Sequence, residues 1–158
     1  GCLLRAYHLV GFKPDRDYRY IAINRELRRL HPEIIRQIIA ELRTKGSDVW
    51  QTHQDDRIVV NNEFSLSVTI ARCKETSTGL LRWKMHFDTS LIPDITIVVR
   101  MDSANRMPLD YYLFPRIDII SGKLRLSEEN GLALDAYRFD NLELLYDIAT
   151  PISIAEVA

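Results

Sequence analysis

The sequence has few cysteines, no long apolar run and almost no net charge. Its 158 residues include only Cys2 and Cys73, which is too few for a disulfide framework and predicts a protein of the reducing cytoplasm. No apolar stretch approaches the roughly 20 residues of a membrane-spanning helix, and no signal-peptide core follows the N-terminus. The 21 basic and 22 acidic side chains nearly cancel, which disfavours a strongly basic nucleic-acid binder.

Motifs for catalysis, metals and cofactors are also missing. The four histidines are scattered, and no glycine-rich phosphate loop, HExxH or GxSxG occurs. Asp94, Asp102, Asp110 and Asp118 recur every eight residues, a spacing that equal strand and loop lengths explain better than a metal site. Pro93 and Asp94 resemble the start of a PD-(D/E)xK nuclease pattern, but no matching lysine follows. We therefore expect no catalytic residue, metal or cofactor, and a magnesium-dependent nuclease is the weakest hypothesis.

Length and composition predict one α+β domain over residues 1–158. Apolar residues make up 46% and charged residues 27% of the chain, as in ordinary globular domains. The chain begins with Gly1 rather than methionine, so it is expected to be either trimmed or part of a longer protein.

The charges are distributed unevenly along the chain. Residues 1–46 carry ten basic and five acidic side chains, whereas residues 127–158 carry one basic and seven acidic side chains. Arginine outnumbers lysine 16 to 5, and arginine suits bidentate recognition of phosphate or carboxylate. Two interpretations stay open: the basic segment docks on the acidic one, or it meets an external polyanion.

Two helices are predicted near the N-terminus, over residues 22–30 and 32–45. Proline favours the first position of a helix, so Pro32 predicts a bend between them. Ile34, Ile38 and Leu42 lie on one apolar stripe of the second helix, and Gly46 fits its C-cap.

The rest of the chain alternates as β-strands do. Apolar and polar residues alternate in four segments, which predicts an antiparallel meander with one buried face. The expected strands are 48–53, 57–61, 64–70, 81–87, 95–101, 109–114, 116–120 and 123–126. The first two follow the helices as in part of a winged helix, and a last helix is expected over 140–149, capped by Asp140.

The meander predicts a cationic row on the solvent face of the sheet. The residues that flank each loop are taken as cross-strand partners, and this fixes the register of the strands. Arg82 then lies opposite Arg100, Arg100 opposite Asp110, and Ser67 opposite His86. Like charges directly opposite each other are unfavourable by roughly 0.2–1 kcal/mol, so this row requires an explanation. Either Asp110 or a covering helix neutralises it, or the row receives phosphates. Its members are Arg82, Lys84, His86 and Arg100, above Ser67 and Thr69.

A second basic set lies on the predicted helices. Arg25, Arg28 and Arg29 share one helical face, and Arg36 and Arg43 share another. Such a face is either solvated or set against a DNA backbone. The candidate nucleic-acid-binding residues are Arg25, Arg28, Arg29, Arg36, Arg82, Lys84, His86 and Arg100.

Three stretches, residues 93–102, 108–113 and 130–139, resemble a bacterial domain found in proteins labelled recombinase or plasmid-associated. The resemblance covers most of the chain and implies a non-catalytic domain near DNA transactions. Two functional hypotheses result: a non-enzymatic DNA-associated module of a mobile-element or plasmid protein, or a protein-interaction domain that forms a homodimer and binds no nucleic acid.

Overall fold

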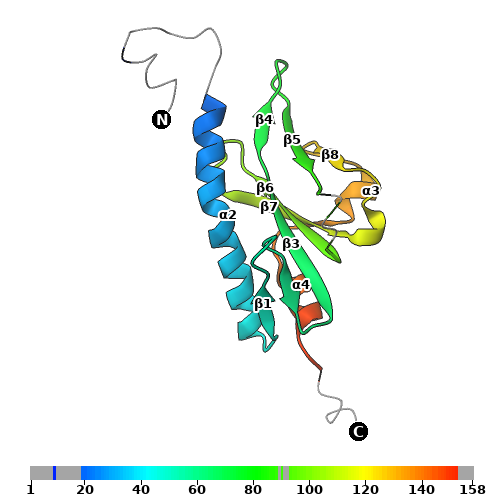
Figure 1. The fold of residues 1–158 in the computed structure, drawn as a ribbon. Helices are drawn as coiled ribbons and strands as arrows, with labels where there is room; N and C mark the ends of the chain where they lie inside the picture. Colours follow the sequence, from blue (N-terminus) through cyan, green and yellow to red (C-terminus); the bar gives the residue numbers. More distant parts are fainter. Residues whose placement is uncertain (1–8, 10–18, 89, 91–92, 153–158) are drawn as a thin grey trace.

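The computed structural model describes residue 9, residues 19–88, residue 90 and residues 93–152. This part of the chain has an α+β fold in three layers (Figure 1). A six-stranded sheet lies in the middle, helices cover one of its faces, and a three-stranded sheet packs on the other. The expected α+β class is therefore confirmed, while Cys2 lies outside the described residues.

One long helix replaces the predicted helix pair. Helix α2 spans Arg19–Thr44 and passes through Pro32, so the predicted break there is wrong. An internal proline costs about 3 kcal/mol, but burial of each large apolar side chain contributes roughly 1.5–3 kcal/mol. Leu27 precedes the proline and Ile35 and Ile38 follow it, and all three are buried on one face. Packing of one continuous apolar face of α2 against the larger sheet therefore outweighs the local cost of Pro32.

The six-stranded sheet contains most of the predicted strands. Its order is β1 (Val49–Gln51), β2 (Ile58–Val60), β3 (Phe64–Ala71), β6 (Ile95–Met101), β7 (Pro108–Pro115) and β9 (Arg138–Phe139). The β1–β2 hairpin and the antiparallel β6–β7 pair are confirmed, including Arg100 opposite Asp110. Strands β3 and β6 are parallel, however, so the four strands do not form a meander.

The other strands form a separate three-stranded sheet. It consists of β4 (Cys73–Glu75), β5 (Leu81–His86) and β8 (Lys123–Leu126), with β5 in the centre. The chain leaves the larger sheet after β3 and enters the smaller one with β4, and Arg72 lies between the two strands. Alternation identifies a strand but not its partner. The predicted pairings of β5 with β3 and with β6 are therefore wrong.

The remaining elements connect and cover the sheets. A 3-10 turn, Arg116–Asp118, stands where a strand was predicted over 116–120. Helix α3 spans Leu132–Asp135 and α4 spans Glu143–Ala149. The expected cap by Asp140 is wrong, because α4 begins later and the Asn141 side chain accepts a hydrogen bond from the Glu143 amide at 3.0 Å.

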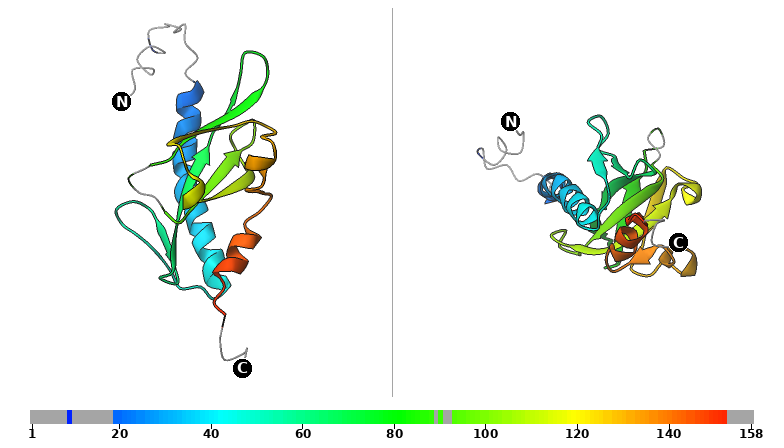
Figure 2. Two further views of the ribbon diagram at one scale, coloured as in Figure 1. Left: turned by 90° about the vertical axis from the view of Figure 1, so that its right-hand side faces the viewer. Right: turned by 90° about the horizontal axis from the view of Figure 1, so that it is seen from below.

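Two cores separate the three layers. The first holds α2 and α4 against the larger sheet, through residues such as Leu42, Ile97 and Leu145. The second lies between the sheets and is built on Trp83, Tyr112 and Leu126. Viewed from below, α2 lies on one side of the larger sheet and the segment from 116 to 135 on the other (Figure 2). The outer face of the smaller sheet is consequently left to solvent.

Candidate nucleic-acid interface

The outer face of the three-stranded sheet is built almost entirely from cations. Residues that alternate with them, such as Trp83, Met85 and Leu126, are buried in the second core. Strand pairing then brings like charges together in two rows, Lys74 opposite Arg82 and Lys84 opposite Arg125, and places His86 opposite Lys123 in the next row. We call these six residues the cationic sheet face.

Within the described residues, the cationic sheet face has no acidic partner. None of its six side chains forms an ion pair with a carboxylate in the described part of the chain. A pocket of about 260 Å³ opens among Lys74, Arg82, Lys84 and Arg125, and Glu75 is the one acid among its lining residues. Like charges directly opposite cost roughly 0.2–1 kcal/mol per pair, so the arrangement opposes folding unless an anion neutralises it.

Arg100 does not belong to this face. It was predicted on the solvent side opposite Arg82, but its side chain is 1% exposed. Its Nε donates to Asp110 Oδ1 at 2.7 Å, and its guanidinium carbon lies 4.5 Å from the centre of the Trp83 ring. The predicted Asp110 partner is confirmed, whereas the predicted exposure is wrong because the second sheet covers this side of β6.

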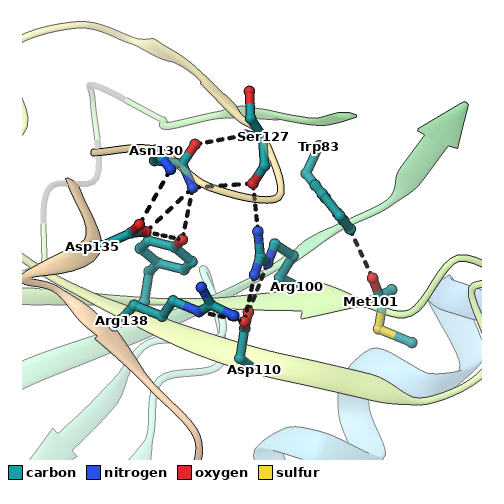
Figure 3. A network of polar contacts seen from close by, with 9 residues as sticks. Trp83, Arg100, Met101, Asp110, Ser127, Asn130, Asp135 and Arg138 are labelled. Carbon is teal, nitrogen blue, oxygen red and sulfur yellow. Dashed lines mark hydrogen bonds and ion pairs between the residues drawn. The ribbon is translucent and has the colours of Figure 1, made fainter. Parts of the chain in front are cut away.

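The buried Arg100 organises a polar network behind the cationic sheet face (Figure 3). Its Nη1 donates to the carbonyl of Ser127, directly after β8, and Asp110 also accepts from Arg138 at 2.8 Å. An ion pair of this kind stabilises little in total but is costly to break, because either partner alone would be a buried charge. The network thus fixes the end of β8, and with it Arg125 and Lys123, relative to the larger sheet.

Tyr112 extends the network toward α3. Its hydroxyl donates to Asp135 at 2.9 Å and accepts from the Asn130 amide at 2.9 Å, while the Asn130 carbonyl accepts from the Ser127 backbone at 2.6 Å. Burial, followed by the hydrogen bond to Asp135, raises the pKa of Tyr112 to about 12. A hydrogen bond from the Asn130 backbone amide is the main cause that lowers the pKa of Asp135. The phenol therefore stays protonated and the carboxylate charged, as a structural anchor requires.

The helical arginines are divided between two sides of α2. Arg28 lines a shallow groove of about 350 Å³ together with His31 and Arg72, whereas Arg29 lines another with Arg106. Arg28 and Arg29 were predicted on one face, so the structure separates them.

The exposed arginines of α2 also differ in their pairing. Arg29 lies 3.5 Å from Glu26 and Arg36 lies 3.9 Å from Glu33. Such exposed pairs on one helix are worth only a few tenths of a kcal/mol. Arg25 and Arg28 form no ion pair within the described part of the chain.

Arg72 joins the helix to the cationic sheet face. It lines both the groove beside Arg28 and the pocket among the sheet cations. Its Nη1 donates to Asn24 Oδ1 at 3.2 Å, and its guanidinium carbon lies 6.0 Å from the centre of the Tyr20 ring. Of the predicted helical set, Arg28 is thus the member that the structure brings to the same groove as Arg72.

The expected docking of the basic segment on the acidic one is confirmed at one residue. Lys45, after the end of α2, lies 3.4 Å from Asp147 and 3.6 Å from Glu143, both on α4. The hydrogen bond to Asp147 is the main cause that raises the pKa of Lys45. The acids of α4 therefore neutralise the end of α2, and they form no ion pair with the cationic sheet face.

The regularly spaced aspartates do not converge. Asp94 accepts from the Ser65 backbone at 2.7 Å, Asp102 accepts from the Arg106 amide, Asp110 binds Arg100, and Asp118 accepts from Tyr137. Over the described ranges, no three histidine, cysteine or acidic residues are placed to hold a metal ion. Asp94 and Asp102 lie at the two ends of β6, as predicted, but Asp110 lies inside β7 and Asp118 in the 3-10 turn, so equal strand and loop lengths do not explain the spacing.

Two further features bear on the predicted chemistry. Cys73 is buried, and burial is the main cause that raises the pKa of its thiol, which makes it a poor nucleophile. No helix among the residues described is long and apolar enough to cross a membrane.

Comparison with known proteins gives little sequence similarity. No protein-family model matches the chain, and no curated protein matches it. Among solved structures, a bacterial homing endonuclease is similar with a TM-score of 0.45 and 16% identity, over 77% of this chain and 92% of that chain. MepB is similar with a TM-score of 0.33 and 11% identity, over 59% of this chain and 85% of that chain. Both TM-scores are low, so the proposals below depend on this chain's own residues.

Proposed function

We propose that the chain binds the phosphate backbone of nucleic acid through the cationic sheet face, as a non-enzymatic DNA-associated module of a mobile-element or plasmid protein. One observation carries this proposal: the three cross-strand rows of the cationic sheet face lie on its outer side, and none of their side chains pairs with an acid among the described residues. Phosphate contacts from lysine and arginine supply most of the affinity of non-specific nucleic-acid binding. A polyanion would therefore relieve the repulsion that the fold itself leaves in place.

The division of charge within the fold supports a polyanionic partner. Lys45 already uses the acids of α4, and Arg29 and Arg36 have acids on their own helix. Arg72 and Arg28 extend the cationic surface along α2. Arg100 holds the sheet from behind and makes no phosphate contact in this proposal.

DNA is proposed as the partner because of the sequence resemblance to the recombinase-associated and plasmid-associated domain. The absence of enzymatic activity is proposed because Cys73 is buried and the four spaced aspartates are separately engaged in hydrogen bonds. The alternative, a protein-interaction domain, predicts no affinity for nucleic acid at low salt.

The experiment is a fluorescence-anisotropy titration of a labelled oligonucleotide with the wild-type protein and two variants. Lys84→Glu reverses a charge in the central strand of the cationic sheet face, and we expect binding about tenfold weaker. Arg106→Glu makes the same change in charge at an exposed residue outside this face, and we expect a much smaller effect. Equal losses in both variants, or no binding by the wild type, would refute the proposal.

A further inference from the structure

A second cavity lies beside the cationic sheet face, where β5 separates from β3. Strand β2 pairs with residues 64–66 of β3, so in the part of the chain that the structure describes residues 67–71 pair with β6 alone and leave one edge without a strand. Beyond β5, the chain at Phe87 and Asp88 passes this edge and encloses a cavity of about 230 Å³. This volume is below the roughly 300–1,000 Å³ of pockets for drug-sized ligands, so its occupant is a small group.

The walls of the cavity differ in chemistry. One wall carries the hydroxyls of Ser67, Thr69 and Thr96, and the Ser67 hydroxyl donates to that of Thr96 at 3.4 Å. The other carries the Phe87 ring together with Ile119. A flat apolar group with a polar edge satisfies both walls, because its face contacts the ring and its edge meets the hydroxyls.

The charges in the cavity disfavour a phosphate. The Arg57 guanidinium is held by Asp55, with Nε to Oδ2 at 2.6 Å, so it contributes little net charge. Asp88 accepts from the Ser90 hydroxyl at 2.6 Å and is exposed. The Asp88 carboxylate would repel an anion but would accept hydrogen bonds from the N–H groups of a nucleobase.

The cavity and the cationic sheet face meet at His86. This residue lines the cavity and also forms the last cross-strand row with Lys123. Lys84 lies two residues earlier on the same face of β5, roughly 7 Å along the strand. A nucleotide whose phosphate contacts this end of the face would have its base beside the cavity.

We infer that the cavity receives one unstacked base of a single-stranded nucleic acid whose phosphates lie along the cationic sheet face. The inference depends on the proposed function and adds that single strands, rather than duplexes, are preferred. Phe87 provides the stacking surface, and Ser67, Thr69 and Asp88 contact the edge of the base. Stacking on an aromatic side chain is the usual source of sequence-tolerant single-strand binding.

The test compares a single strand with an abasic single strand of equal length and phosphate number, and with the duplex of the same length, which carries two phosphate backbones. The wild type should bind the natural single strand about tenfold more tightly than the abasic strand. Phe87→Leu should abolish this difference. Thr69→Val should reduce it without removing a core ring, and so serves if Phe87→Leu fails to fold. Thr44→Val, at the exposed end of α2, is the matched control and should leave the difference unchanged.

The outcomes separate this inference from the proposed function. Equal affinity of the wild type for natural and abasic strands, with binding still weakened by Lys84→Glu, would overturn the base-binding cavity and leave the phosphate-binding face intact. Preference for the duplex would also overturn it. Loss of all binding to every ligand would overturn both proposals.

Discussion

The salt dependence of binding provides a quantitative test of the cationic sheet face. This face carries five permanently charged side chains: Lys74, Arg82, Lys84, Lys123 and Arg125. Each phosphate of a single strand that is neutralised lowers the logarithm of affinity by about 0.7 per decade of salt. If each of the five side chains neutralises one phosphate, the total slope is about −3.5. Between about 50 and 200 mM salt, affinity should then fall about 130-fold.

Neutralising two charges should flatten this dependence by a predictable amount. The double variant Lys84→Gln and Arg125→Gln removes one complete cross-strand row. With three contacts left, the slope becomes about −2.1, and the same rise in salt weakens binding only about 20-fold. On a duplex, where each contact contributes about 0.9 to the slope, the same rise in salt weakens binding of the wild type about 500-fold and binding of the double variant about 40-fold.

The assay is anisotropy with a labelled oligonucleotide at four or more salt concentrations, on the wild type and the double variant. The exposed pair Arg106→Gln and Arg116→Gln is the control, because it removes the same charge away from the sheet and should keep the wild-type slope. An unchanged slope in the Lys84 and Arg125 variant, whatever its affinity, would refute the assignment of phosphate contacts to this face.

Three further predictions concern stability. Asp110→Asn leaves Arg100 as a buried, uncompensated charge and should lower the free energy of unfolding in urea by about 3–5 kcal/mol; a loss below about 1 kcal/mol would contradict the buried network. Burial is the main cause that raises the pKa values of Tyr112 and Tyr146 to about 12, above an unfolded value near 10. Folding should therefore keep its full stability below about pH 10 and lose about 2–3 kcal/mol per tyrosine as pH rises to about 12. Urea unfolding at both ends of that range checks this, and Tyr112→Phe should make the loss smaller. Pro32→Ala restores a hydrogen-bond donor within α2 and should raise the unfolding free energy by about 1–3 kcal/mol; a less stable variant would show that the proline fits a bend in the helix.

Alternation along the chain identified the cationic strand but not its neighbours. Arg82, Lys84 and His86 were assigned to an exposed face because they alternate with Leu81, Trp83 and Met85; the structure exposes Lys84 and His86 and leaves Arg82 half-buried. Their cross-strand partners are not from β3 or β6. Lys123 and Arg125 alternate with Leu124 and Leu126 in the same way, so the signal was present. Pairing across some 40 residues of chain is set by the second core, which local periodicity does not report.

Arg100 shows where the assumption of one solvated face fails. Arg100 was placed toward solvent because it alternates with the core residues of β6, yet it is buried together with Thr96 and Val98 on the same side of the strand. The apolar Val98 in this row was the one local indication of a second covered face. A strand buried on both sides requires a partner for any charge it carries, and Asp110 supplies it.

The cavity beside β3 could not be predicted because it depends on tertiary arrangement. Ser67 and His86 were expected to meet by direct strand pairing, whereas in the structure they line one cavity without pairing. Strand β5 belongs to the other sheet and separates from β3, which opens the space between them. Pro32 was misread for a different reason. The preference of proline for the start of a helix predicted two helices, but the buried apolar residues on both sides of Pro32 keep α2 continuous.

The central claim, that the outer face of β4, β5 and β8 meets the nucleic-acid backbone, is tested most directly by mapping the contact in solution. An unlabelled single strand is added to isotope-labelled protein, and amide chemical-shift changes are followed residue by residue. We predict that the changes concentrate on Lys74, Arg82, Lys84, Lys123 and Arg125, extend to Arg72, and leave α4 unaffected. Changes confined to α2 or α4, with the three strands unaltered, would contradict the account.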